Sequence, residues 1–302
     1  MRDRIDTLLQ TLNHTIIGKS EAIRLVLVAL FSGGHALLED VPGVGKTLLA
    51  RSLAQSIDGH FQRLQCTPDL LPADITGTNI WNPGQAEFQF LPGPVFANIL
   101  LIDEINRATP RTQSALLEVM EEDQVTIDGL SRPVPQPFFA IATQNPAEYH
   151  GTFPLPEAQL DRFALCLSLG YPSQREEIQM VEGLGLTPGT HPLHPCLSLG
   201  EVLEIRRQCS QVRLENSLQE YLVHLVRATR SHPDIGLGVS PRGTLAFGRA
   251  VQALAYLQGR TYAIPDDIKA LTIPVLAHRL VTNGSNPAQA ILEDLLATTP
   301  IP

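Results

Sequence analysis

Residues 37–54, LLEDVPGVGKTLLARSLA, combine an apolar strand-like run, a loop with two glycines and the start of a helix-like run. Gly45-Lys46-Thr47 matches the end of the phosphate-binding pattern G-x-x-x-x-G-K-[ST], but Asp40 replaces the first glycine of that pattern. A strand, a glycine-containing loop and a helix N-terminus place backbone N–H groups and the positive end of a helix dipole at one point. The stretch therefore predicts a triphosphate site, and it raises the question of what a carboxylate does there.

The residue types of this loop fit phosphate chemistry. Glycines permit a close backbone approach, Lys46 would reach the β- and γ-phosphates, and the Thr47 hydroxyl would ligate Mg²⁺. The alternative is a chance strand, turn and helix with a lysine at the helix start. We expect Asp40 to lie at the strand exit and to turn outward, onto a nearby backbone N–H group. The predicted nucleotide-binding residues of this stretch are Pro42, Gly43, Val44, Gly45, Lys46, Thr47 and Leu48.

Two further strand-like runs end in polar side chains. In NILLIDEINRA an apolar run leads into Asp103 and Glu104, and in FFAIATQNP another leads into Gln144 and Asn145. Ligands of open α/β sheets bind at the carboxyl ends of the strands. We therefore expect Asp103 to hold Mg²⁺ and Glu104 to orient and activate an attacking water. Asn145 is a candidate hydrogen-bond donor to the γ-phosphate or to that water. The alternatives are an ordinary strand-to-helix turn for the acids and an Asn-Pro turn for Asn145.

The composition limits the class of protein. The chain has 302 residues, 43% of them apolar, which is enough for the core of one large domain or two smaller ones. Its net charge of −9 argues against nucleic acid as a partner. The four cysteines lie far apart without C-x-x-C spacing, which argues against a zinc site and a disulfide framework. The sequence lacks a signal-peptide core and an apolar run long enough to be a transmembrane segment. We expect a cytoplasmic protein.

Strand-like and helix-like segments alternate as far as about residue 170, which is typical of a mostly parallel α/β sheet with helices on both faces. Beyond Gly170-Tyr171-Pro172 the pattern becomes one of amphipathic helices. We predict an α/β nucleotide-binding core at residues 1–172 and a smaller all-helical lid at residues 173–302. The predicted strands are residues 35–39, 61–66, 97–103, 138–143 and 163–169.

The chain resembles the MoxR group of AAA+ ATPases in five motifs that occur in the same order. They are LLEDVPGVGKT, GPVFANILLIDEINRA, TQSALLEVMEE, ATQNP and PLPEAQLDRF. The resemblance covers about residues 17–249. It implies a P-loop NTPase core of the AAA+ type with a helical lid, a homo-oligomeric hexameric ring and ATP bound between neighbouring subunits. It also implies a chaperone-like role on a protein client, often together with a protein that bears a von Willebrand factor A domain. An acid is often found in this group at the position of Asp40, so Asp40 does not cancel the predicted ATP site.

The resemblance assigns Arg162, in LDRF, as the arginine finger. A finger would point at the γ-phosphate held by the adjacent subunit, whereas the local alternative is a surface ion pair with Asp161 or Glu157. A desolvated guanidinium aimed at a transferred phosphate contributes about 10³-fold or more to the rate. An exposed ion pair contributes about 1 kcal/mol or less to stability. Only the finger would make hydrolysis depend on assembly.

Two more assignments follow from the resemblance. Arg242, in SPRGTLAFGRA, matches the second sensor on the lid, where Ser240 is the expected helix N-cap and Pro241 the first helical residue. A cation at the positive end of a helix favours an anionic partner, here the nucleotide, over a solvated arginine. Ile17 and Gly18, in IIGKSEAIR, match the stretch whose backbone cradles adenine, although by itself this stretch indicates only a turn before a helix.

Two β-hairpins are predicted outside these motifs. Residues 74–94 place an Asn-Pro-Gly turn between alternating apolar residues that include Ile80, Phe88 and Phe90, and residues 124–134 place Asp128-Gly129 between short β-like runs. By resemblance, both hairpins lie near the pore of the ring. The alternative is that they only cover the core.

Three other functions compete with an ATP-hydrolysing ring. A nucleotide-dependent scaffold with negligible turnover would use the same residues. A small-molecule kinase also uses a P-loop, but it needs an acceptor pocket that the sequence does not indicate, and Glu104, Arg162 and Arg242 together argue against it. A DNA-translocating motor is disfavoured by the acidic balance.

Overall fold

The centre of the molecule is a parallel sheet. The structure is a computed structural model that describes residues 1–145, 151–182, 193–284 and 286–301. Five strands form the sheet in the order β2-β5-β8-β1-β9, and all neighbouring pairs are parallel. They are β1 (Ala36–Glu39), β2 (Phe61–Gln65), β5 (Ile99–Asp103), β8 (Phe139–Gln144) and β9 (Leu165–Leu167). The predicted parallel sheet is confirmed, and the predicted strands end within two residues of the observed ones.

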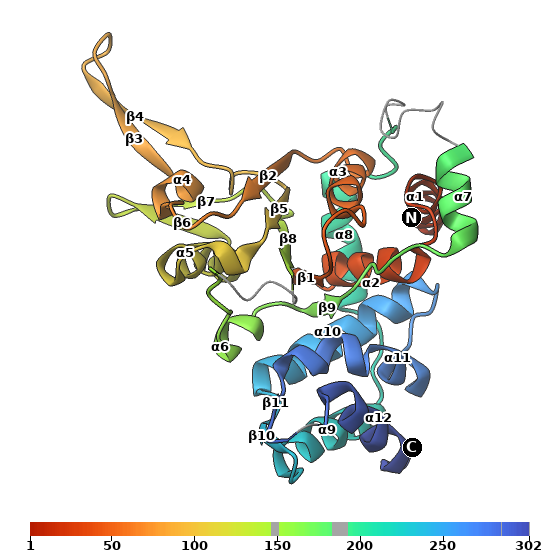
Figure 1. The fold of residues 1–302 in the computed structure, drawn as a ribbon. Coiled ribbons are helices and arrows are strands. Elements are labelled where there is room, and N and C mark those ends of the chain that lie inside the picture. The colour runs from red at the N-terminus through yellow and green to blue at the C-terminus, as the bar shows by residue number, and fades with distance from the viewer. Residues whose placement is uncertain (146–150, 183–192, 285, 302) are drawn as a thin grey trace.

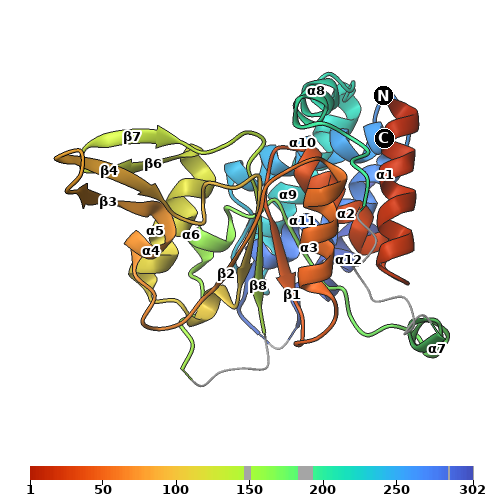
Figure 2. The same cartoon turned by 90° about the horizontal axis from the view of Figure 1, so that it is seen from above.

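Helices cover both faces of the sheet, as predicted. Side chains alternate along a strand, so Ile99 and Leu101 of β5 join one buried apolar cluster while Leu100 and Ile102 join another. Figure 2 shows α1–α3 on one side of the sheet and α4 and α5 on the other. The helices and the short 3-10 turn of this part are α1 (Arg2–Thr15), α2 (Ser20–Phe31), α3 (Lys46–Ser56), α4 (Pro72–Thr76), η1 (Ile105–Arg107), α5 (Pro110–Glu122) and α6 (Glu157–Leu160).

The chain after β9 is mainly helical. Its elements are α7 (Gln174–Glu182), α8 (Leu199–Cys209), α9 (Asn216–Ser231), α10 (Pro241–Leu257), α11 (Pro265–Leu276), η3 (Ala277–Arg279) and α12 (Ala288–Thr298). Figure 1 shows α9–α12 gathered below the sheet. One buried apolar cluster runs from α2 into α8, α10 and α11, so the lid helices pack against the core. The predicted boundary after residue 172 stays a prediction.

One part of the lid is not helical. Strands β10 (Ile235–Leu237) and β11 (Val281–Thr282) form a short antiparallel pair that the sequence analysis did not predict. The pair joins distant segments of the chain, and a two-residue strand leaves no periodic pattern to detect. Among the described residues of the lid, these are the only strands, and the other regular elements are helices.

Both predicted hairpins are present. Figure 1 shows the β3–β4 hairpin projecting from the body of the molecule. The turn of the second hairpin has positive φ at Asp128 (51°) and Gly129 (77°), as a two-residue type I′ turn requires. Phe88 is 70% exposed, whereas the ring of Phe90 is covered by the guanidinium of Arg132, 4.2 Å from its centroid. Phe88 is thus the one of the two phenylalanines that is available to a partner. The hairpin strands are β3 (Gly77–Asn82), β4 (Glu87–Pro92), β6 (Gln124–Ile127) and β7 (Leu130–Pro133).

The cysteines and the apolar helices give three further findings. All four cysteines are free thiols, and Cys66 and Cys209 are buried. Within the described ranges, no three His, Cys, Asp or Glu side chains are grouped so that they could hold a metal ion. In the same ranges, no helix is both long enough and apolar enough to cross a membrane.

Candidate nucleotide site

Strands β1, β5 and β8 end at the same edge of the sheet, beside a cavity of about 350 Å³. Most of the residues that the sequence predicted for a nucleotide line this cavity, namely Pro42, Gly43, Gly45, Lys46, Thr47, Leu48, Asp103, Glu104 and Asn145. Val44 is part of the same loop but packs against the apolar core. Three lining residues were not predicted, namely Arg63, Gln65 and Thr143. The structure thus brings the three strand-end motifs to one place.

The loop before α3 offers backbone donors to an anion. Gly43 (φ 86°) and Gly45 (φ 98°) have left-handed backbone conformations that side chains disfavour. Gly45 is the N-cap of α3, and no side chain caps this helix end, so its first N–H groups have no side-chain acceptor. Lys46 Nζ donates a hydrogen bond to the backbone oxygen of Asp40 at 3.0 Å. The Lys46 ammonium therefore lies beside the loop between β1 and α3, next to the N–H groups at the start of α3 that no side chain caps.

Asp40 does not face this cavity. Its carboxylate is buried and accepts hydrogen bonds from Ser168 Oγ at 2.7 Å, Leu169 N at 2.5 Å and Gly170 N at 3.0 Å. The expectation that Asp40 turns away from the nucleotide site and onto backbone N–H groups is confirmed, and its carboxylate is buried rather than exposed to solvent. The donors come from the segment after β9, the edge strand beside β1, and only the strand order reveals that this segment is near.

Asp103 ends the fully buried strand β5 and is held by two neighbours. Arg63 Nε donates to Asp103 Oδ2 at 2.6 Å, and Thr143 Oγ1 donates to Asp103 Oδ1 at 3.3 Å. Arg63 comes from β2 and Thr143 from β8, the two strands that flank β5. The carboxylate is thus fixed at the cavity wall by both adjacent strands.

Glu104 has a non-glycine left-handed backbone conformation, with φ 56°. Such a conformation costs about 1–3 kcal/mol and is concentrated at functional sites. The Glu104 amide donates to Thr143 Oγ1 at 2.9 Å, and Glu104 Oε2 accepts from Gln65 Nε2 at 3.1 Å. Arg107 pairs with the same carboxylate at 3.2 Å. Gln65 could not be recognised from sequence, because its role depends on the register that places it opposite Asp103.

Asn145 directly follows β8, is buried and lines the cavity. The preceding side chain, Gln144, donates instead to the carboxylate of Glu39 on β1. The two amides therefore have different surroundings, and Asn145 is the one at the cavity. Pro146, which completes the predicted Asn-Pro turn, lies outside the described residues.

Arg162 and Arg242 lie together at a second cavity, of about 480 Å³, which shares no lining residue with the first. Both guanidinium groups pair with the carboxylate of Glu121. Burial, and then the nearby Arg242, lower the pKa of Arg162 below its usual value. The alternative of an Arg162 ion pair with Asp161 or Glu157 is wrong, since its partner is Glu121.

The predicted start of the lid helix that carries Arg242 is confirmed. Ser240 is the N-cap of α10 and accepts a hydrogen bond from Gly243 N at 3.0 Å, and Pro241 is the first helical residue. Arg242 is half exposed and faces the second cavity, so in this chain it does not contact the loop of residues 42–48. The structure brings it to Arg162, a neighbour that sequence spacing did not indicate.

Gly18 lies at a third cavity, of about 310 Å³, between α2, the segment after β9 and α11. Its φ is 75°, and the carboxyl group of Glu176 occupies the space that a Cβ atom would need. Ile17 is half-buried and does not line this cavity. The assignment of Ile17 and Gly18 to adenine stays a prediction.

Comparisons with known proteins agree with this geometry. Residues 35–165 match the family described as ATPase family associated with various cellular activities (AAA), and residues 227–295 match the AAA lid domain. The chain is 48% identical over 299 residues to the uncharacterized protein YeaC of Bacillus subtilis, covering 96% of this chain and 92% of YeaC. It is 44% identical over 275 residues to Chaperone MoxR1 of Mycobacterium tuberculosis, covering 88% of this chain and 72% of MoxR1.

A more distant relative and a solved structure extend the similarity. Protein MoxR of Paracoccus denitrificans is 30% identical over 326 residues, with 96% of this chain and 94% of that protein covered. The crystal structure of a candidate ATPase from Cytophaga hutchinsonii superimposes with a TM-score of 0.93 at 36% identity. That match covers 100% of this chain and 96% of the other.

Proposed function

Since the chain belongs to the MoxR family of AAA+ ATPases, we propose that it binds ATP with Mg²⁺ and hydrolyses it between the subunits of a hexameric ring. The energy of this cycle is used to remodel, assemble or activate a partner protein complex. The observation that carries the proposal is the meeting of Lys46, Asp103, Glu104 and Asn145 at one cavity, while Arg162 and Arg242 lie together at another.

The residues around the first cavity fit a Mg²⁺–triphosphate. The α3 N-terminus without a side-chain cap and the Lys46 ammonium suit phosphate oxygens. Thr47 and Asp103 supply a hydroxyl and a carboxylate, the hard oxygen ligands that Mg²⁺ takes together with water. When bound, Mg²⁺ would neutralise charge that develops on the phosphates. Pro42, Gly43, Val44, Gly45 and Leu48 complete the loop in this proposal.

Glu104 is the proposed general base. Its carboxylate is at the cavity wall, and the hydrogen bond from Gln65 and the ion pair with Arg107 fix its direction. A carboxylate that is held in place can orient a water and accept its proton as the water attacks the γ-phosphate. Asn145 would donate to that water or to the γ-phosphate.

Arg162 and Arg242 are proposed to act on the nucleotide of the adjacent subunit. Each is partly exposed, and neither lines the cavity beside the phosphate-binding loop (residues 42–48) of the same subunit. A guanidinium that approaches from a neighbour neutralises charge in the transition state only after assembly. Hydrolysis would then require a ring.

The proposal includes the remaining predictions. The core comprises residues 1–172 and the lid residues 173–302, Ile17 and Gly18 cradle adenine, and the protein acts in the cytoplasm. Phe88, on the projecting β3–β4 hairpin, is a candidate contact for a protein client or for a partner with a von Willebrand factor A domain.

The test is the rate of phosphate release as a function of protein concentration, with particle mass measured on the same samples by light scattering. We expect the rate per subunit to rise with concentration and to reach a plateau where the hexamer predominates. Nucleotide binding by the ring without phosphate release would instead favour the scaffold. A rate per subunit that is independent of assembly would contradict action between subunits.

A further inference from the structure

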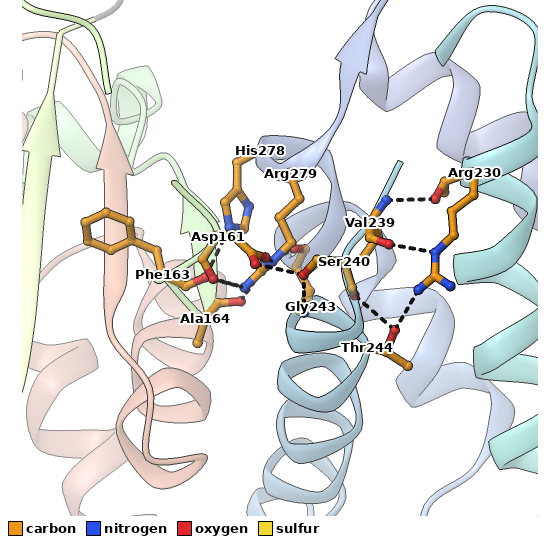
Figure 3. Close-up of polar contacts among 12 residues, drawn as sticks. Asp161, Phe163, Ala164, Arg230, Val239, Ser240, Gly243, Thr244, His278 and Arg279 are labelled. Carbon is orange, nitrogen blue, oxygen red and sulfur yellow. Dashed lines mark hydrogen bonds and ion pairs between the residues drawn. The ribbon is translucent and has the colours of Figure 1, made fainter. Parts of the chain in front are cut away.

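Arg279, in the 3-10 turn after α11, is buried where the lid meets the core (Figure 3). Its Nε donates to Asp161 Oδ1 at 2.8 Å, and its terminal nitrogens donate to the backbone oxygens of Phe163, Ala164 and Val275. Asp161, Phe163 and Ala164 belong to the segment between α6 and β9, on either side of Arg162. The guanidinium of Arg279 therefore binds residues on both sides of Arg162, namely the carboxylate of Asp161 before it and the backbone oxygens of Phe163 and Ala164 after it.

The same Asp161 carboxylate also reaches the start of α10. Ser240 Oγ donates to Asp161 Oδ2 at 2.7 Å while it accepts from Gly243 N at 3.0 Å. Ser240 is the N-cap of the helix whose second residue is Arg242. Asp161, which directly precedes Arg162 on the core, thus binds the N-cap of the lid helix that carries Arg242. Figure 3 shows Asp161 between Arg279 and Ser240.

The packing around Arg279 leaves little room for another arrangement. A Cβ atom at Gly243 would lie 2.9 Å from Arg279 Cδ and 2.7 Å from Val239 Cγ1, closer than side chains pack. Helix α10 can approach Arg279 this closely only because residue 243 is glycine. At their tips, Arg162 and Arg242 share the Glu121 carboxylate. The two arginines are held together at their tips by Glu121 and near their backbones by the Arg279–Asp161–Ser240 network.

We propose that Arg279 is a positioning residue that, through Asp161 and Ser240, holds Arg162 of the core and Arg242 of the lid as one unit. The inference rests on the proposed function, in which these two arginines act on the adjacent subunit's nucleotide. Loss of the network would displace both arginines without changing the cavity that binds the subunit's own ATP. The effect would therefore fall on turnover, because misplacement by about 1 Å can cost about 10²-fold in rate.

The lid offers a matched control. Arg230 Nε donates to the backbone oxygen of Val239 at 2.8 Å (Figure 3). Thr229 Oγ1 accepts from Val239 N at 3.1 Å. Arg230 thus also fixes the chain just before α10, but within the part of the chain that the structure describes its hydrogen bonds go to the lid residues Val239 and Thr244. A change at Arg230 tests whether disturbing this loop is sufficient to lower turnover.

The experiment compares Arg279→Lys with Arg230→Lys. Lysine keeps the charge at residue 279, but its single ammonium cannot reach Asp161 and the three backbone oxygens together. We expect Arg279→Lys to turn over ATP about 10- to 100-fold more slowly than the parent. Its ATP affinity should remain within about threefold of the parent. Arg230→Lys should keep parental turnover. Ser240→Gly supplies a second variant: it removes the donor to Asp161 together with the acceptor for Gly243 N, and glycine is tolerated as an N-cap.

Subunit mixing separates positioning from structural damage. Arg279→Lys should regain activity when mixed with Glu104→Gln, because some interfaces then join an intact Glu104 to intact arginines. It should regain no activity when mixed with Arg162→Ala, because no subunit in that mixture presents both Arg162 and Arg242 correctly placed. Recovery with Arg162→Ala, or parental turnover of both Arg279→Lys and Ser240→Gly, overturns the inference.

Failure of the proposed function gives a different result. In that case the reference mixture of Glu104→Gln with Arg162→Ala fails to recover activity in samples shown to exchange subunits. If the reference mixture recovers activity and both Arg279→Lys and Ser240→Gly turn over ATP like the parent, only the positioning role is wrong. Thermal melting of each variant shows whether folded protein is being compared.

Discussion

Replacing Asp40 with alanine should destabilise the protein while leaving ATP binding almost unchanged. The buried carboxylate accepts hydrogen bonds from Ser168 Oγ, Leu169 N and Gly170 N. Each hydrogen bond to a charged group is worth about 1.5–3 kcal/mol, and alanine leaves two backbone N–H groups without this acceptor. Because such contributions are not additive, we expect the free energy of unfolding to fall by about 3–5 kcal/mol.

That loss can be followed by thermal melting. For a chain of this size, each kcal/mol shifts the melting temperature by about 2–4 °C, so Asp40→Ala should melt roughly 6–20 °C below the parent. Ser168→Ala is the matched control, since it removes one neutral donor and leaves both backbone donors paired with Asp40. We expect it to cost about 1.5 kcal/mol, the value of a single hydrogen bond to a charged group at the low end of that range.

Nucleotide titration of Asp40→Ala tests whether the charge of Asp40 opposes ATP binding. A carboxylate about 8 Å from a phosphate charge would oppose binding by about 2 kcal/mol at an effective dielectric constant of 20. If Asp40 acted in this way, its removal would tighten ATP binding about 30-fold. Because Asp40 points to residues 168–170 and does not line the cavity, we expect a change of only severalfold. A 30-fold gain in affinity, or a melting temperature equal to that of the parent, would refute the reasoning.

Three further predictions concern catalysis and acid stability. Glu104→Gln should bind ATP but release no phosphate, since an amide cannot accept the water's proton, whereas Lys46→Ala should lose affinity in the same titration. Arg162→Ala should bind ATP without hydrolysing it, and phosphate release should partly return on mixing with Glu104→Gln; a mixture that exchanges subunits and stays inactive contradicts action between subunits. Burial lowers the pKa of His35 from 6.5 to about 4, so the unfolded chain takes up a proton in that range and the folded chain does not. Melting at successive pH values should therefore show stability falling by about 3 kcal/mol from pH 6.5 to 4, and a variant His35→Gln that keeps the full slope would exclude His35 as its source.

The sequence by itself determined the strands, the phosphate-binding loop and the polar residues at the strand ends. These features are local. The Gly43–Gly45 loop needs only its own backbone conformations and the helix that follows, and a buried parallel strand is recognisable as a continuous apolar run. Because neighbouring parallel strands end at one edge, Asp103 and Asn145 could be placed near Lys46 before the strand order was known.

Only the tertiary structure decided which polar groups meet across the chain. Asp40 is buried under residues 168–170 because β9 lies beside β1, and Arg63 reaches Asp103 because β2 lies beside β5. Arg162 and Arg242 meet at Glu121 because the lid packs back on the core. Hydrophobic periodicity specifies an element and its buried face, but it carries no information about which other element will cover that face. Strand order and domain packing are fixed by apolar contacts between residues far apart in sequence, and polar partners such as the Asp161–Arg279 pair are set only when those contacts form.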